Sequence, residues 1–202
     1  MTPMPPQAAP PKSNQNLVLL IVLVVGGLSL LCCVGTLAAI AVPNFLKFGA
    51  RSKQAEAKSN LKGAFMAEKS WMVEHDAYSE SIEEIGFSPE RNNRYSYFFS
   101  KSVNPLLPGS PDGGQHTGVA VEPRMGVGPA GALYAAIPPA LISELGLRGK
   151  CLERCNITIV AAGNLDTDPT IDLWSISTED RIIDGTPVPA GLPYNHVDDT
   201  RK

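Results

Sequence analysis

Three carboxylates close together in the chain are the clearest candidates for metal chemistry. Asp166, Asp168 and Asp172 lie in the segment DTDPTID, and carboxylate oxygens are ligands that Ca²⁺ prefers. The spacing departs from an EF-hand, because Ile171 replaces the expected glycine and Ser177 replaces the expected bidentate glutamate. Two interpretations therefore stay open: a calcium site, or a hairpin loop whose aspartates accept hydrogen bonds from turn amides.

Two cysteines separated by three residues are candidates for a disulfide. Cys151 and Cys155 occur in CLERC, and in an oxidising compartment they could close a small loop. Zinc would need two more ligands nearby, and the chain has no C-x₂-C pair and no histidine cluster. Cys32 and Cys33 lie in an apolar run, where cysteine packs as a small hydrophobic residue. We therefore expect a disulfide between Cys151 and Cys155.

The sequence contains no residue set typical of catalysis or nucleotide binding. Residues 126–131 match G-x-G-x-x-G, but the proline pair at 138–139 follows within about two turns and no βαβ unit surrounds the match. His75, His116 and His196 are far apart, and G-x-S-x-G is absent. The net charge of −3 does not indicate nucleic-acid binding. We predict no enzyme activity, no nucleic-acid partner and no cofactor other than the calcium considered above.

The elements that would position these residues begin with an apolar run. Residues 17–42 are 26 positions without Asp, Glu, Lys, Arg or His. As a helix they would extend about 39 Å, which is enough to cross the ~30 Å hydrocarbon core of a bilayer with some tilt. The run is too long for a signal peptide, which is the competing interpretation. We predict a transmembrane helix over 17–42, after a proline-rich disordered tail over 1–16.

A helical pattern continues beyond this run and is followed by strand patterns. The apolar residues expected on one helix face are Phe45, Phe48, Ala55, Leu61, Phe65 and Met72. Pro43 should bend the helix, which should end around 76–81. Strands are expected over 94–100, 118–121, 156–162 and 171–177, the last two forming a hairpin, whereas the Gly- and Pro-rich stretch 105–131 should be loop.

These patterns predict an α+β fold. One long helix followed by a few antiparallel strands buries its apolar stripe by lying across the sheet, which gives a two-layer head. The long N-terminal helix would then run from the membrane into the core and pack on a small antiparallel sheet. The head should cover 43–184, including the C-terminal half of the helix, and 185–202 should be a flexible tail.

Residues 34–45 (VGTLAAIAVPNF) followed by 52–65 (SKQAEAKSNLKGAF) resemble type IV pilins and secretion-system pseudopilins. Segments of the head are also similar to pilin-like heads, namely AYS (77–79), GFSP (86–89), RYSY (94–97) and AAGNLDTDPTIDLWSI (161–176). The resemblance implies a structural protein of the bacterial inner membrane, with a cytoplasmic N-terminus and the head in the periplasm or at the surface. The lysines and arginines after the span alone would indicate the opposite orientation.

The same resemblance implies association through the membrane helix. Partners would be the membrane, other pilin-like subunits or envelope machinery, because subunits of the family associate mainly by side-by-side helix contacts. Small residues allow helices to approach closely, although they are also common in single spans. The candidates for helix packing are Gly26, Gly27, Gly35, Ala38, Ala39 and Pro43.

The N-terminal motif departs from the family pattern. A glycine normally precedes the cleaved bond, a phenylalanine follows it and a glutamate comes a few residues later; here these places hold Ile21, Val22 and Gly26. An uncleaved chain offers no amine inside the bilayer, and a lone carboxylate there would be costly. Our hypothesis is a single-pass protein that keeps its tail and is not processed as an ordinary pilus subunit. The alternative is a periplasmic binding or sensing module on a pilin scaffold, with its site in 105–131 or in the Asp-rich hairpin.

Overall fold

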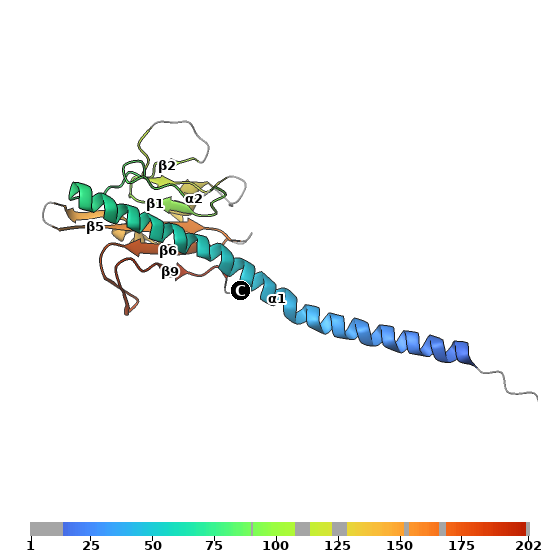
Figure 1. Ribbon diagram of the computed structural model, residues 1–202. Coiled ribbons are helices and arrows are strands. Elements are labelled where there is room, and N and C mark those ends of the chain that lie inside the picture. Colours follow the sequence, from blue (N-terminus) through green and yellow to red (C-terminus); the bar gives the residue numbers. More distant parts are fainter. Residues whose placement is uncertain are drawn as a thin grey trace, which may run out of the picture. The chain divides into compact units, whose positions relative to one another are not determined.

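The computed structural model describes residues 14–89, 91–107, 114–122, 129–151, 154–165 and 169–200. The chain forms two compact units, Met1–Leu46 and Lys47–Lys202. One helix, α1 (Gln15–His75), runs through the first unit and continues into the second (Figure 1). Its stretch Asn16–Val42 has a mean hydropathy of 3.1 and none of it is buried. This stretch is long and apolar enough to cross a membrane, as the sequence predicts.

The second unit, Lys47–Lys202, is called the head below. The part of α1 that belongs to the head buries one narrow face. Its most buried side chains are those of Gln54, Ala57, Leu61, Ala64 and Glu68, all at most 7% exposed. Their spacing of three and four residues places them on one side of the helix. The helix ends at His75, next to the predicted end, and Asp76 turns the chain with a φ of 53°.

The predicted apolar face of α1 is wrong in part. Phe45, Phe48 and Ala55 are exposed, Phe65 and Met72 are half-buried, and Leu61 alone of the expected set is fully buried. The sequence-based prediction of the buried face gave most weight to large apolar side chains. The small side chains of Ala57 and Ala64 are instead fully buried in the core cluster with residues of β1, β5 and β6.

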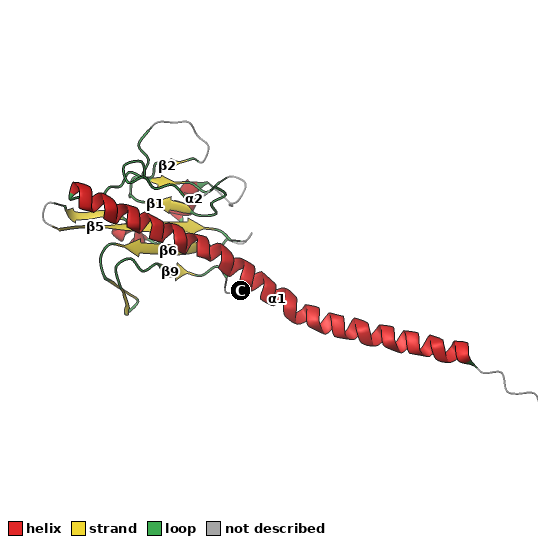
Figure 2. Ribbon diagram, in the orientation of Figure 1, coloured by secondary structure: helices red, strands yellow, loops and turns green. Residues whose placement is uncertain are grey.

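Within the described residues, the head contains a seven-stranded sheet, in the order β2-β3-β1-β5-β6-β9 with β4 paired to β5 (Figure 2). The strands are β1 (Ser96–Phe98), β2 (Pro105–Leu106), β3 (Gly118–Val119), β4 (Gly146–Lys150), β5 (Arg154–Gly163), β6 (Asp172–Ser177) and β9 (Tyr194–Val197). The pair β2·β3 is parallel and the other pairs are antiparallel. A separate hairpin joins β7 (Arg181–Ile183) to β8 (Thr186–Val188). The predicted β5–β6 hairpin is confirmed.

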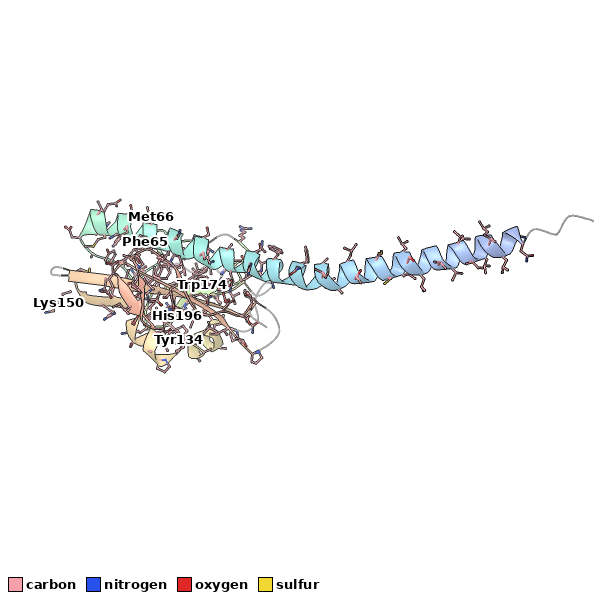
Figure 3. The ribbon with its side chains drawn as sticks, turned by 90° about the horizontal axis from the view of Figure 1, so that it is seen from below. Phe65, Met66, Tyr134, Lys150, Trp174 and His196 are labelled. Carbon is pink, nitrogen blue, oxygen red and sulfur yellow. A yellow bond between two sulfur atoms is a disulfide. The ribbon has the colours of Figure 1, made fainter. Side chains whose placement is uncertain are left out.

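Both faces of the sheet are covered. On β5, Ile159 and Ala161 join the core cluster under α1, whereas Val160 and Ala162 join a second cluster with α2 (Ala130–Ala135) and α3 (Pro139–Glu144). Figure 1 shows α1 lying across β5 and β6, and Figure 3 shows Tyr134 of α2 on the opposite side of the sheet from Phe65 of α1. The α+β class is confirmed, but the head has a third layer that the two-layer prediction omits.

The expected flexible tail over 185–202 is also corrected. Within the described part of this stretch, β8 and β9 are strands, and β9 pairs with the fully buried β6. The backbone N–H of Gly191 donates to the carbonyl of Ser177 at 2.9 Å, which fixes the connection between these strands. The Gly and Pro content indicated a loop, but the open edge of β6 supplies hydrogen-bond partners that local composition does not reveal.

Candidate functional site

The side chain of Asp172 joins several parts of the head. It is fully buried at the start of β6, and its two oxygens accept hydrogen bonds from helix, loop and strand residues. The donors are Gln54 Nε2 (2.8 Å), Tyr95 Oη (2.6 Å), Trp174 Nε1 (2.5 Å), Asn195 Nδ2 (3.3 Å) and the Asp199 backbone N (3.2 Å). Burial, with the charge of Asp172, raises the pKa of Tyr95 well above its ordinary value, so the phenol keeps the proton that it donates.

This network bears on the calcium prediction. Asp166 and Asp168 lie outside the described residues, so the calcium prediction is untested there. Asp172 is committed to five donors, and its carboxylate therefore has a role in holding the fold. Across the described ranges, no group of three or more His, Cys, Asp or Glu side chains is arranged to hold a metal ion.

Cys151 directly follows β4, and Cys155 is the second residue of β5. The structure joins them in a disulfide with their Cα atoms 4.4 Å apart, next to the last β4–β5 pair, Lys150 with Arg154. A Cα separation of this size is within the range that a disulfide spans. The bond would restrain the end of a hairpin, which is a stabilising role.

The disulfide remains a prediction that cysteine counting tests. We expect the denatured, unreduced protein to take up two alkyl groups, at Cys32 and Cys33, and the reduced protein to take up four, because a disulfide sulfur does not react with an alkylating reagent. Intact mass spectrometry measures the difference. A Cys151→Ser/Cys155→Ser variant should take up two groups under both conditions, and four groups on unreduced wild type would contradict the pairing.

The three histidines have different partners. The ring of His75 stacks on Trp71, and His116 Nδ1 lies 2.6 Å from Glu83 Oε1. Burial, with the charge of Arg181, lowers the pKa of His196 to about 4, so its ring is neutral at pH 7. His196 Nε2 lies 2.7 Å from the hydroxyl of Ser175, but Ser175 is fully buried. A serine that no substrate can reach does not make a hydrolytic site of this pair.

A cleft of about 590 Å³ opens between the segment after α1 and strands β2 and β3. Ile82, Phe87 and Val119 line it with apolar surface, and Arg91 and Glu122 place charged groups beside them. The size and lining resemble those of small-molecule sites, which are mostly apolar with a few polar groups. The sequence pointed to 105–131 as a binding region, and Val119 and Glu122 of that region line this cleft.

Comparison with known proteins assigns the family. Residues 48–107, which include the head part of α1 and extend through β2, match the family model described as type IV pilin PilA. The type IV major pilin protein PilA of Myxococcus xanthus (strain DK1622) is 36% identical over 189 residues, covering 82% of this chain and 86% of that protein. The chain belongs to the type IV pilin family. It is therefore a pilin-like structural protein of the bacterial envelope, and the resemblance seen in the sequence is confirmed.

The membrane helix of this type IV pilin carries the predicted packing residues. At Gly26, Gly27 and Gly35 an added Cβ would meet nothing within 4 Å, and Ala38 and Ala39 are exposed. Pro43 lies within α1, and its predicted bend is not tested. These positions leave surfaces on which another helix can approach, so their packing role stays a prediction.

Lysines on the pilin head are engaged within the head itself. Lys53 Nζ donates to the carbonyl of Leu165 at 2.5 Å, and Lys58 Nζ lies 4.7 Å from the ring centroid of Trp174. These contacts link α1 to the β5–β6 loop and to β6. The two lysines therefore help to hold α1 on the head.

Proposed function

We propose that this type IV pilin keeps its N-terminal tail and remains a single-pass protein of the bacterial inner membrane. In this proposal the tail is cytoplasmic and the head is in the periplasm or at the surface. Other pilin-like subunits or pilus machinery would be its partners, since that is how members of the family assemble. The observation that carries the proposal is the pattern at Ile21, Val22 and Gly26, where the family's cleavage glycine, phenylalanine and glutamate are all replaced.

The physical argument concerns charge in the bilayer. A processed pilin has a free amine at the start of its helix, and a nearby glutamate on a neighbouring subunit can pair with it. Across Asn16–Val42 this chain has no charged side chain, and all the described side chains are exposed. An amine created at residue 22 would therefore lie in hydrocarbon without a carboxylate partner, which is costly. Retention of the tail avoids that cost.

Intact mass of the protein purified from its native membranes tests the proposal. We expect a mass that includes residues 2–21, and a chain beginning at or near residue 22 would refute retention of the tail. The matched control is the triple variant Ile21→Gly, Val22→Phe and Gly26→Glu, which restores the family pattern. In the same cells this variant should be shortened by about 21 residues, which would show that the peptidase that cleaves pilins of the family is active there.

The proposed orientation has its own test. Protease added outside spheroplasts should remove the head and spare the N-terminal tail.

The cleft supports a second candidate, a binding or sensing module on the pilin scaffold. Its apolar lining beside Arg91 suits a small amphipathic carboxylate. The guanidinium can pair with the carboxylate of the ligand while the hydrocarbon chain of the ligand contacts Ile82 and Val119. We expect octanoate to raise the thermal midpoint of the full chain in lipid nanodiscs, because a ligand that binds only the folded state stabilises it. Ser88→Trp, which should fill the cleft from an exposed position, should abolish the rise. An equal rise in this variant, or none in wild type, rejects the octanoate site.

A further inference from the structure

Glu68 is a buried carboxyl group with incomplete hydrogen bonding. It lies on the buried face of α1 and is 0% exposed. Its Oε2 accepts a hydrogen bond from the backbone N–H of Ser79 at 3.2 Å, whereas its Oε1 has no hydrogen-bond partner. The Ser79 contact ties the helix to the segment that follows it, residues 78–87, which is called the 78–87 segment below.

The charged groups around Glu68 are mostly acidic. Glu80 and Glu84 of the 78–87 segment both act on it electrostatically. Both carboxylates have partners of their own: Glu80 Oε1 accepts from the Leu147 N–H at 2.8 Å, and Glu84 Oε2 accepts from the Ser79 hydroxyl at 2.5 Å.

The nearest lysine in sequence does not neutralise this cluster. Lys69 follows Glu68 on α1, but its Nζ donates to the hydroxyl of Tyr78 at 3.2 Å. Within the described residues, none of the ion pairs includes Glu68. A carboxylate at this position would therefore be buried beside two like charges without a counterion, a situation that is costly unless water can reach it.

We propose that Glu68 makes the contact between α1 and the 78–87 segment a pH-sensitive latch, which is tight while the carboxyl group can stay neutral and weakens as ionisation becomes favourable. The segment is the part that can move, because α1 is packed on the sheet along its buried face. Among the described residues, a backbone–backbone hydrogen bond joins the segment to another part of the head, from Ile82 N–H to His116 O at 3.0 Å, whereas the bond from Phe87 N–H to Ile82 O at 2.9 Å lies within the segment. Displacement of the segment would let water reach the Glu68 carboxylate.

The pH range follows from linkage. Burial raises the pKa of Glu68 from 4.5 to about 8; the Ser79 hydrogen bond opposes this shift, and Glu80 and Glu84 add to it. A carboxyl group exposed by opening would titrate near its ordinary value, so the closed state binds the proton more tightly. The latch is therefore strongest below about pH 5, loses strength between about pH 5 and 8, and changes little above that range.

Opening of the segment would also change the cleft. Ile82, Glu83 and Phe87 belong to the 78–87 segment and line the cleft. A latch at Glu68 would therefore make the shape of this surface depend on pH. The inference does not depend on whether the N-terminal tail is retained, because every group involved lies in the head.

Hydrogen exchange followed by mass spectrometry tests the latch on the full chain in lipid nanodiscs. After correction for intrinsic exchange, the protection of peptides from 78–87 should fall by up to about tenfold for each pH unit between pH 5 and 8 and then level off. Peptides from β5 should not follow this profile. In Glu68→Gln the protection of 78–87 should stay constant with pH, because the amide does not titrate.

Two further variants keep the test decisive. Glu74→Gln alters an exposed glutamate of the same helix and should leave the wild-type profile unchanged. Glu84→Gln removes one of the like charges, so the fall in protection should end at a lower pH and be smaller. A wild-type profile in Glu68→Gln, or no fall at 78–87 in wild type, overturns the proposal. If Glu68→Gln does not fold, a wild-type profile in Glu84→Gln overturns the proposal instead.

Discussion

Replacement of Asp172 with alanine is expected to lower the free energy of unfolding of the head by about 3–5 kcal/mol. The side chain of Asp172 is fully buried and receives hydrogen bonds from Gln54 on α1, Tyr95 before β1 and Trp174 on β6. Alanine would leave these donors without their acceptor in a site that excludes water. Each unsatisfied buried donor costs about 1–3 kcal/mol, so the losses add to a large fraction of the stability of a domain.

Denaturant unfolding of the full chain in detergent, followed by tryptophan fluorescence, measures this effect because Trp174 donates to the removed group. The matched control is Asp180→Ala. Asp180 is exposed and accepts one hydrogen bond, from the Ala190 N–H at 2.8 Å, so its loss should cost less than about 1 kcal/mol. Equal stabilities of the two variants would show that the Asp172 network does not hold the head together.

The long elements of the fold could be predicted because their signals are local. Helix α1 and its end were predicted from the uncharged run at 17–42 and the helical spacing after it. The β5–β6 hairpin was predicted from the β-branched and aromatic residues of its two strands. These signals repeat within a few residues. They arise from the periods of a helix and a strand, which hold whatever the rest of the chain does.

The short elements could not be predicted because tertiary contacts stabilise them. Helices α2 and α3 have six residues each, too few to be stable alone, and they form on a face of the sheet that exists only in the folded head. Strand β4 reads GLRGK, with four of its five residues exposed. Strand β9 depends on the open edge of β6.

The candidate sites also depend on tertiary contacts that the sequence does not reveal. Asp172 was singled out for its neighbours in sequence, Asp166 and Asp168, but its role in the structure comes from donors far away in the chain, such as Gln54 and Tyr95. Glu68 and Glu74 are both glutamates of α1, but the first lies on the buried face of the helix and the second is exposed. Burial of a polar side chain is a property of the fold, which local patterns do not encode.

Replacement of Gly118 with alanine is expected to lower the free energy of unfolding by about 2–3 kcal/mol. Gly118 lies on β3 opposite Phe98 of β1, and an added Cβ would overlap the backbone carbonyl oxygen of Tyr97. A flexible side chain could move aside, but this obstacle is the backbone of a neighbouring strand. The β1·β3 contact would therefore have to shift, and with it Val119 at the cleft and the parallel pairing of β2 with β3.

A glycine-to-alanine substitution elsewhere in the chain should raise the free energy of unfolding instead of lowering it. Gly63 lies on the exposed side of α1, where an added Cβ meets nothing within 4 Å. Gly63→Ala should raise the free energy of unfolding by about 1 kcal/mol, because alanine loses less backbone entropy in a helix. Both variants are compared with wild type by denaturant unfolding of the full chain. A Gly118→Ala protein as stable as wild type would show that β1 and β3 do not approach as closely as the structure places them.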